Sequence, residues 1–456
     1  MSPAFQSSTS IGALFHGAEK EGISWTLIGG TPVVYLRDPA LIRQLFITKS
    51  ESISRCGGQT RGPFGSGKRI AGTTLITADG DVARRWHADM LRGFNNRPAM
   101  DSFHTTLVSI AERHVKRLRN LRKGNYLQVH IQKFALDAVW SLGFGLDNAS
   151  EVTGTQEWLE TFGQYVQTAA SIAHPLKHIV MNIMSGRPFE ESDMVESAIG
   201  DKIDKVVLGL LEDNIDLVNP DTAKNSKHMN FLQRISSETG GTALQPITAD
   251  VFAHAKQIFS HGCSAPTLQL LWALRELSLR PDVRQRLRTE LRQSAWIEKQ
   301  DIQLLYQLPY LDAVVNEIFR LYPPIPTTAR IIDNPVHLKA ASEASISLPT
   351  EAQVTFSLDM LHHDPQIWGE DANKFRPERW DSLHMNTLES ECKFVTFLVG
   401  PRRCPCSGYV LQMVKVFLAV CVLEVDLEVT NAMAVEKRLG PVSVPTVPLG
   451  FAVQDA

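Results

Sequence analysis

Apolar residues recur every three or four positions along most of the chain between residues 82 and 330. This spacing is typical of amphipathic α-helices. The longest such stretch would span roughly 45 Å as one helix, at about 1.5 Å per residue. The pattern therefore predicts a mainly α-helical protein with one helix long enough to cross a domain. The predicted helical windows are 103–122, 126–145, 155–175, 196–213, 248–278, 281–294 and 310–321, followed by a last helix at 407–420.

Other stretches lack the helical period. Residues 24–37 are rich in β-branched and aromatic side chains around a Gly-Gly turn, which indicates a hairpin. Residues 330–357 contain short apolar runs between Pro and Ser and predict a second small β region. Residues 215–247 are polar and irregular and predict a surface loop. Because no repeat or low-complexity linker divides the chain, we expect a single domain over residues 1–456, with a flexible start at 1–11.

Composition narrows the class of protein. Hydrophobic residues make up 43% and charged residues 21%, which is normal for a globular chain. The net charge of -3 is too small to predict a nucleic acid as partner. The six cysteines are sparse, and no secretory signal precedes them, so reduced thiols are favoured over disulfides. The best apolar run, Val416–Leu423, is shorter than the about 18–20 residues of a membrane helix. We therefore expect no transmembrane anchor.

The stretch most informative about chemistry is a loop ahead of the last predicted helix, Phe397-Leu-Val-Gly400-Pro-Arg402-Arg-Cys404. A thiolate that binds iron is stabilised by backbone N–H donors, a helix N-terminus and a nearby cation. Gly400 permits a close approach of the backbone to a flat ligand, and Arg402 supplies a cation. Phe397 can pack on the sulfur side. The loop is therefore a candidate site for iron ligation.

These residues resemble the signature of the cytochrome P-450 family, Phe-x-x-Gly-x-Arg-x-Cys-x-Gly. Phe397, Gly400, Arg402 and Cys404 match it at the family spacing, whereas Cys406 stands in place of the last glycine. If Cys406 were the ligand, the pattern would shift by two residues and would require Phe at 399 and Gly at 402. The chain has Val399 and Arg402 there, which do not fit. The resemblance therefore implies that Cys404 is the axial ligand of a haem b.

Two further segments resemble the same family. Glu317 and Arg320 lie three residues apart on one face of a helix that ends at a double proline. Arg379 stands in a later Phe-Arg-Pro-Glu-Arg-Trp segment. The resemblance implies that these three form a buried structural network that holds the cysteine loop. Between them lie His362 and His363, which we interpret as hydrogen-bonded loop residues and not as metal ligands.

The resemblance also implies partners for the haem propionates. Arg330 and Arg402 match family arginines that pair with a propionate, and a buried carboxylate needs such a cation. Trp86 resembles the tryptophan of a Trp-x-x-x-Arg motif that also donates to a propionate, although simple core packing is an equally good interpretation. Met90 stands at the arginine position of that motif. The neighbouring candidates to replace the arginine are Arg85, His87 and Arg92.

The long helix departs from the family pattern Ala-Gly-x-Asp/Glu-Thr-Thr on the oxygen side. The matching positions run from His261 to Pro266, and only Gly262 is kept. In the family, the acid and the second threonine help to deliver protons to bound oxygen. Pro266 has no backbone donor and is expected to kink the helix at the Gly262 carbonyl. We expect that carbonyl, His261, Ser264 and ordered water to form a replacement proton relay.

The resemblance implies a haem-thiolate oxidoreductase with the mostly helical P-450 fold, with small β-sheets near the N-terminus and after the Glu-x-x-Arg helix. The sequence is similar to biosynthetic members from filamentous fungi. We expect a monomeric monooxygenase that inserts one oxygen atom from O2 into a small lipophilic, secondary-metabolite-like substrate. An NADPH-dependent reductase would supply its electrons. Such members usually carry an N-terminal anchor, which we do not expect in this chain. We therefore expect either a cytoplasmic protein or one peripheral on the cytosolic face of the endoplasmic reticulum.

Two alternatives to a monooxygenase remain, because the oxygen-side motif is altered. The first is an oxygen-independent haem-thiolate isomerase, dehydratase or coupling enzyme, since family members of that kind also lack the threonine. The second is an inactive haem-binding relative or sensor. Detectable turnover of any small lipophilic compound would distinguish an enzyme from the second alternative.

Overall fold

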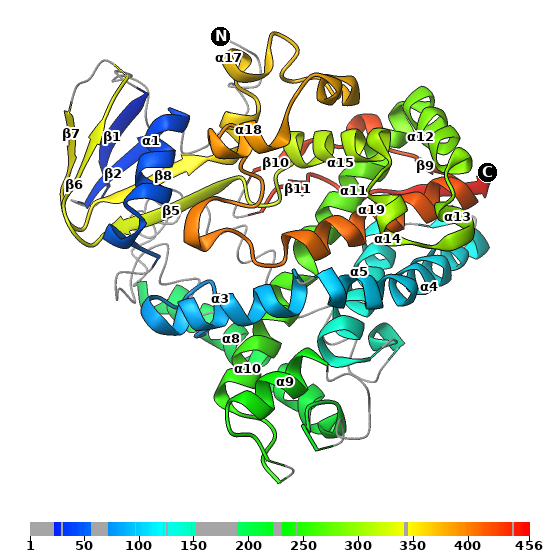
Figure 1. Ribbon diagram of the computed structural model, residues 1–456, viewed down its shortest axis with the longest axis horizontal. Helices are drawn as coiled ribbons and strands as arrows, with labels where there is room; N and C mark the ends of the chain where they lie inside the picture. Colours follow the sequence, from blue (N-terminus) through cyan, green and yellow to red (C-terminus); the bar gives the residue numbers. More distant parts are fainter. Residues whose placement is uncertain are drawn as a thin grey trace.

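The computed structural model describes five main stretches of the chain and shows a helical body beside a small β-sheet (Figure 1). The predicted helix at 155–175 lies outside the described residues. The described stretches are 22–28, 31–55, 72–151, 189–221 and 230–456, apart from short gaps at 96, 122, 125, 147, 243, 342–344 and 440–441.

The longer helices confirm the mainly α-helical class, and most of them fall in predicted windows, whereas the helix Gly80–Phe94 lies outside every window. Their apolar faces meet in one large core cluster, in which α4, α5, α11 and α19 contact one another. The longer helices are α3 (Gly80–Phe94), α4 (Arg97–Leu121), α5 (Leu127–Phe144), α8 (Phe189–Asp213), α9 (Phe231–Glu238), α10 (Ala249–Gln257), α11 (Ser264–Leu279), α12 (Pro281–Gln293), α15 (Pro309–Leu321) and α19 (Ser407–Glu424). The shorter helices are α1 (Pro39–Arg43), α13 (Trp296–Lys299), α14 (Ile302–Leu305), α16 (Leu358–His362), α17 (Pro365–Trp368) and α18 (Met385–Ser390).

The expected hairpin shares one sheet with the first and last strands of the second predicted β region. The expected hairpin is β1 (Ile23–Ile28) and β2 (Thr31–Leu36), and β2 pairs in parallel with β8 (Gln353–Ser357). The sheet continues through β5 (Thr327–Ile332) to β3 (Ile53–Ser54), in the order β1-β2-β8-β5-β3. Its apolar face covers a second core cluster beneath α1, so the segment after α15 is held against the start of the chain.

Three smaller sheets complete the β structure of the described residues. One joins the end of the chain to the strand that follows α19, which fixes the C-terminal turn against the helical core. These sheets contain β6 (Val336–Lys339) with β7 (Ser345–Leu348), β4 (Lys123–Gly124) with β12 (Phe451–Asp455) and β9 (Val425–Val429), and β10 (Lys437–Arg438) with β11 (Val444–Pro445).

The prediction of an irregular loop over 215–247 was wrong in part, because α9 lies within it. Asn230 caps this helix by accepting from the Gln233 backbone N–H at 2.9 Å, and the Gln233 side chain accepts from the Asn230 backbone N–H in return. Phe231 and Ile235 bury its apolar face. Eight residues are too few to produce a clear helical period in the sequence, so tertiary contacts and the cap decide this helix.

The single long helix predicted at 248–278 is interrupted. A π-helical segment, η8 (Ile258–Gly262), follows α10, and a turn at Cys263 separates it from α11. Pro266 lies in the first turn of α11 and has no N–H to donate to the Gly262 carbonyl. The helix is therefore interrupted next to that carbonyl, and the interruption takes the form of a π-bulge, a feature common at functional sites.

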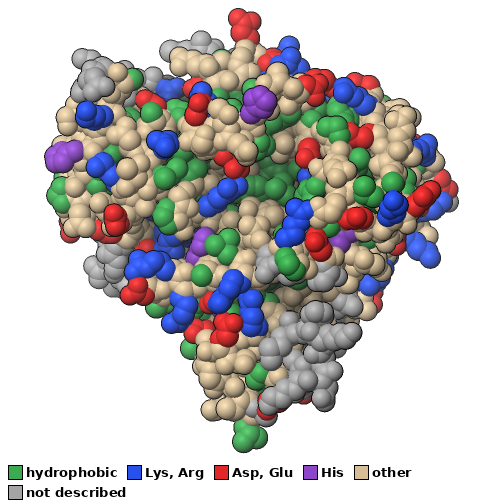
Figure 2. All heavy atoms as spheres, viewed as in Figure 1, with side chains coloured by type: hydrophobic (Ala, Val, Ile, Leu, Met, Phe, Trp, Pro, Cys, Tyr) green, Lys and Arg blue, Asp and Glu red, His purple; other side chains and the backbone are tan. Residues whose placement is uncertain are grey.

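The most apolar helix, α19, packs against α4, α11, α12 and α15. Among the described residues it is the one helix long and apolar enough to cross a membrane, and 78% of it is buried inside the protein. It extends the predicted helix at 407–420 by one turn and remains a core helix. On the face shown in Figure 2, acidic and basic side chains are interspersed and form no large field of one sign, in keeping with the small net charge.

Candidate functional site

The cysteine loop leads directly into α19. A 3-10 turn, η10 (Gly400–Arg402), tightens the loop, and the Cys404 N–H donates to the Phe397 carbonyl at 2.7 Å. The Phe397 ring lies against Phe319 of α15, with 5.2 Å between the ring centroids. Cys404 is therefore held three residues ahead of the first residue of α19, where unpaired backbone N–H groups favour a negative charge.

A steric constraint that the sequence did not predict requires glycine at position 400. Its φ is +71°, and a Cβ atom there would lie 2.1 Å from the backbone carbonyl oxygen of Phe46. Phe46 belongs to a second π-helical segment, η3 (Gln44–Thr48). The loop is thus pressed against η3, and only glycine combines this backbone conformation with so close an approach.

The electrostatic surroundings distinguish Cys404 from Cys406. Burial raises the pKa of the Cys404 thiol, whereas the Cys406 backbone N–H and the guanidinium groups of Arg403 and Arg55 act to lower it. For Cys406, burial and the neighbouring Cys404 both raise the pKa well above its ordinary value. Cys404 is therefore the thiol of the pair that has the donor and the cations that a thiolate ligand needs.

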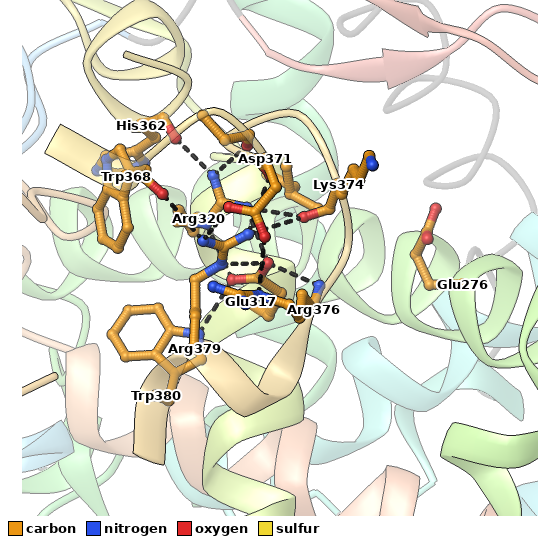
Figure 3. A network of polar contacts seen from close by, with 12 residues as sticks. Glu276, Glu317, Arg320, His362, Trp368, Asp371, Lys374, Arg376, Arg379 and Trp380 are labelled. Atoms are coloured by element: carbon orange, nitrogen blue, oxygen red, sulfur yellow. Dashed lines mark hydrogen bonds and ion pairs between the residues drawn. The ribbon is translucent and has the colours of Figure 1, made fainter. Parts of the chain in front are cut away.

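The predicted network of Glu317, Arg320 and Arg379 is present and buried (Figure 3). Glu317 Oε1 accepts from Arg320 Nη2 at 2.8 Å and from Arg379 Nε at 2.9 Å. Glu317 Oε2 accepts from Arg320 Nε at 2.9 Å and from Trp380 Nε1 at 3.0 Å. Asp371 adds a second carboxylate, 3.2 Å from Arg379. Two arginines are thus balanced by two acids, which compensates for their burial.

His362 joins this network to the cysteine loop. Its backbone carbonyl accepts from Arg320 Nη1 at 2.7 Å, and its ring Nε2 accepts from the Val395 N–H at 3.0 Å. Burial, followed by the charge of His363, lowers the pKa of His362 to about 3, so the ring is neutral. The Nδ1 atom of His363 lies 2.7 Å from the Asp359 carbonyl oxygen. Both histidines are therefore hydrogen-bonded within the protein, as predicted, although His362 is the last residue of α16 and not a loop residue.

Arg402 reaches across to the turn ahead of α3. Its Nη2 donates to the Ala78 carbonyl and, at 2.8 Å, to Asp79 Oδ1. Its Nη1 is buried and has no hydrogen-bond partner in the described part of the chain. A buried guanidinium N–H without an acceptor is expensive to maintain, so this atom indicates an acceptor that the protein itself does not supply.

Arg330 is buried on β5, with 5% of its surface exposed. Its Nη1 donates to Thr328 Oγ1 at 3.0 Å and to the Ala329 carbonyl at 2.7 Å. The guanidinium lies over the Phe46 ring, 5.4 Å from its centroid. The backbone of Phe46 also approaches Gly400, so Phe46 lies against both Arg330 and the cysteine loop.

The Trp86 indole is bonded within the protein. Its N–H donates to Asp250 Oδ1 of α10 at 2.6 Å, which favours the interpretation of Trp86 as a residue of the protein's own packing. Arg85 also forms an ion pair with Asp250, at 2.9 Å. Met90, at the position of the family arginine, is buried in the core. The other proposed substitutes are also engaged: His87 Nε2 with the Arg403 carbonyl at 2.8 Å, and Arg92 with Asp89 and Glu238.

The oxygen-side residues lie in and just after the π-bulge. Ser264 Oγ donates to the His261 carbonyl at 3.2 Å. Burial, followed by the charge of Arg55, lowers the pKa of His261 to about 4, so its ring is neutral near pH 7. Gly262 packs tightly, because a Cβ there would lie 2.9 Å from Val139. Thr267 Oγ1 is buried and donates to the Cys263 carbonyl at 2.7 Å, which occupies it within the helix.

Comparison with known proteins agrees with this geometry. The family model described as cytochrome P-450 matches residues 9–453. The chain belongs to the cytochrome P-450 family. It is 31% identical over 202 residues to cytochrome P-450 monooxygenase claU of Ampulloclitocybe clavipes, an alignment that covers 41% of this chain and 37% of that protein. It is 25% identical over 408 residues to cytochrome P-450 4X1 of Rattus norvegicus, covering 85% of this chain and 75% of the rat protein.

The chain is also similar to a plant protein along most of its length. Cytochrome P-450 CYP72A616 of Paris polyphylla is 25% identical over 430 residues, which cover 91% of this chain and 77% of the plant protein. The chain therefore spans well under half the length of the first fungal relative and about three quarters of the rat and plant relatives. The cysteine loop and the buried Glu-Arg network both fall within the matched residues.

The residues of this P-450 chain fit a haem. Cys404 has the surroundings of a thiolate, and Arg402 has a buried N–H directed at no protein acceptor among the described residues. Sequence reasoning missed one contributor, Arg55. Its charge reaches both Cys404 and His261, and its backbone N–H donates to Asp79, the residue that also binds Arg402. Arg55 directly follows β3, and no motif in the sequence marked it.

Proposed function

We propose that the protein is a monooxygenase that binds haem b through Cys404 and inserts one atom of O2 into a small lipophilic, secondary-metabolite-like substrate. The observation that carries the proposal is the contrast between two neighbouring thiols, since Cys404 has a backbone N–H donor and two cations and Cys406 has neither. Electrons would come from an NADPH-dependent reductase, and we propose that the chain acts as a monomer with a single domain.

The protein would hold the cofactor through three arginines. Arg402, Arg330 and Arg55 would bind its carboxylates, while the network around Glu317 keeps the cysteine loop in place. When bound, the haem supplies the binding and reductive cleavage of O2. The chain's own contribution is to position the thiolate, to exclude water and to deliver protons.

We propose that protons reach the oxygen side through the π-bulge. The Gly262 carbonyl has no donor four residues on, because residue 266 is proline, and it can therefore hold a water molecule. Ser264 Oγ, on the next turn, already donates to the His261 carbonyl and can exchange that bond for one with the same water. The neutral His261 ring has one donor nitrogen and one acceptor nitrogen, which suits it to pass a proton.

A second candidate function has one specific observation in its favour. Thr267 is the nearest threonine to the family position, and its hydroxyl is occupied by the Cys263 carbonyl. A helix without the usual acid and threonine suits an oxygen-independent haem-thiolate isomerase, dehydratase or coupling enzyme. Such an enzyme would convert substrate without consuming O2 or a reductant.

The test begins with the visible spectrum of the purified, reduced protein exposed to carbon monoxide. We expect the strongly red-shifted band of cysteinate-ligated haem, lost in Cys404→Ala and kept in the matched control Cys406→Ala. Loss of the band only in Cys406→Ala would overturn the assignment of the ligand. Oxygen uptake with a reductase and NADPH then separates the two functions, since the oxygen-independent alternative predicts product without uptake. Absence of any product across lipophilic compounds would indicate an inactive relative.

A further inference from the structure

A cavity of about 420 Å³ lies between the neighbouring helices α4 and α5 (Figure 1). Its walls include His114, Arg117 and Leu121 of α4 and His130 and Lys133 of α5. The residues of α4 are spaced at i, i+3 and i+7 and those of α5 at i and i+3, so each helix turns one face to the cavity. A hollow of this size falls within the range of about 300–1,000 Å³ of small-molecule sites, and the proposed chemistry does not use it.

The cavity lies in a strongly basic stretch of a slightly acidic chain. Residues 112–133 contain seven lysines and arginines and one acidic residue, whereas the whole chain has a net charge of -3. The positive potential reaches the cavity wall, because the pKa of His130 is lowered by burial and then by the charge of Lys133. The cavity therefore favours an anionic ligand over a cationic one.

Acidic side chains near the cavity do not cancel this charge. Asp137 is buried and pairs with Arg113 at 3.2 Å. Glu151, which lines the cavity, accepts from Nη2 of Arg117, and a guanidinium group has further N–H donors to offer. Lys133 has no ion-pair partner within the described residues. One ammonium group and part of one guanidinium group therefore remain for a ligand.

Apolar side chains mark the other end of the cavity. Leu121, the last residue of α4, lines it and is 47% exposed. Tyr126, directly before α5, is 55% exposed, and Val129 is 41% exposed. Lys133 lies about two helical turns from Tyr126, or roughly 10 Å along α5. The cavity thus has a cationic end and an apolar end, the arrangement that suits an amphipathic anion.

We propose that this cavity binds a lipophilic monocarboxylate, such as a medium-chain fatty acid. Lys133 and Arg117 bind the carboxylate, and the apolar chain runs along Leu121 toward Tyr126. A monoanion is favoured over a phosphate dianion, because Lys133 is the one lining cation without an acid partner in the described part of the chain. The site is built from α4 and α5 and not from the cysteine loop, so the inference is independent of the proposed chemistry.

The test titrates decanoate into the purified haem-loaded protein by calorimetry. We expect Lys133→Gln to weaken decanoate binding about tenfold, because the carboxylate loses its charged partner. Lys133→Arg keeps the charge and should retain the binding, which also separates a lost contact from a lost fold. Equal affinity in wild type and Lys133→Gln would mean that decanoate binds elsewhere, for example in the haem pocket, and would overturn the proposal.

Lys116→Gln is the matched control. It removes the same charge from an exposed position of α4 that does not line the cavity, and it should change the affinity for decanoate by less than about twofold. An equal loss in Lys116→Gln and Lys133→Gln would indicate a general attraction to the basic face and not a site, and it would overturn the proposal.

Two further probes test the two ends of the ligand separately. Decanol keeps the chain without the charge, and its binding should not depend on Lys133. Acetate keeps the charge without the chain and should bind at least about tenfold more weakly than decanoate. Leu121→Ser should reduce the ratio of decanoate to acetate affinity. Decanol binding that Lys133→Gln weakens as much as decanoate binding would contradict the assignment of the carboxylate.

Discussion

Arg379 donates to the Glu317 carboxylate at 2.9 Å although 62 residues separate them, and both side chains are buried. The pair ties α15 to the segment that precedes the cysteine loop, with the Arg376 N–H adding a further bond to the same oxygen at 2.9 Å. The position of the Cys404 thiol therefore depends on a buried ion pair, Glu317 with Arg379, that lies outside the cysteine loop.

Glu317→Gln should be strongly destabilising. The substitution leaves Arg320 and Arg379 buried beside a neutral amide, a change for which about 3–5 kcal/mol of unfolding free energy is typical. Denaturant unfolding and haem content measure the effect. The control is Arg286→Ala, which breaks a half-exposed pair with Glu378 and should change stability by about 1 kcal/mol or less. Equal losses in the two variants would contradict the structural role of the network.

Gly400→Ala should displace the cysteine loop from η3. The new methyl group meets the Phe46 carbonyl oxygen, and alanine is strained at a φ of +71°. We expect a smaller thiolate band per mole of protein and a lower unfolding temperature. Gly209→Ala is the opposite control, because Gly209 lies inside α8 with open space around it and alanine favours helix. A normal band in Gly400→Ala would show that the contact with η3 does not position the thiol.

His261→Phe should lower the rate of product formation about tenfold and increase the oxygen consumed per product, because it removes one group of the relay while water remains. The ring has a pKa of about 4 and is neutral at pH 6 and at pH 8, so the ratio of wild-type to variant rates should be constant between them. Thr267→Val is the control, since its hydroxyl is bonded within the helix. Unchanged turnover and coupling in His261→Phe would exclude the relay.

Acid should destabilise the fold below about pH 6.5, the ordinary pKa of histidine. Burial lowers the pKa of His104 to about 4, and the ring accepts from the Trp296 indole N–H at 3.1 Å. Between pH 6.5 and pH 4 the unfolded chain takes up a proton that the folded chain does not, so stability decreases as the pH falls. His104→Gln should reduce the loss in urea midpoint between pH 7 and pH 5. An unchanged pH slope would show that His104 is not a source of the acid sensitivity.

The sequence by itself determined the elements whose signal is local. The apolar period predicted α5, α12 and α15 to within one residue at each end, because each helix buries one continuous face, whereas α4 begins six residues before its predicted window. The spacing of the cysteine loop singled out Cys404, and the three-residue spacing of Glu317 and Arg320 brought them onto one helix face. These predictions hold because backbone geometry relates residues that are close in sequence, whatever surrounds them.

Tertiary structure decided what depends on residues far apart in the chain. The hairpin at β1 and β2 and the later strands join in one sheet through pairings across more than three hundred residues, which no local period reveals. Asp250 of α10 accepts a hydrogen bond from the Trp86 indole of α3, a contact between two helices far apart in the sequence. Glycine is required at position 400 because the backbone of η3 lies against the cysteine loop. Short α9 forms because its apolar side chains find a core. In each case the deciding interaction exists only after the chain has folded.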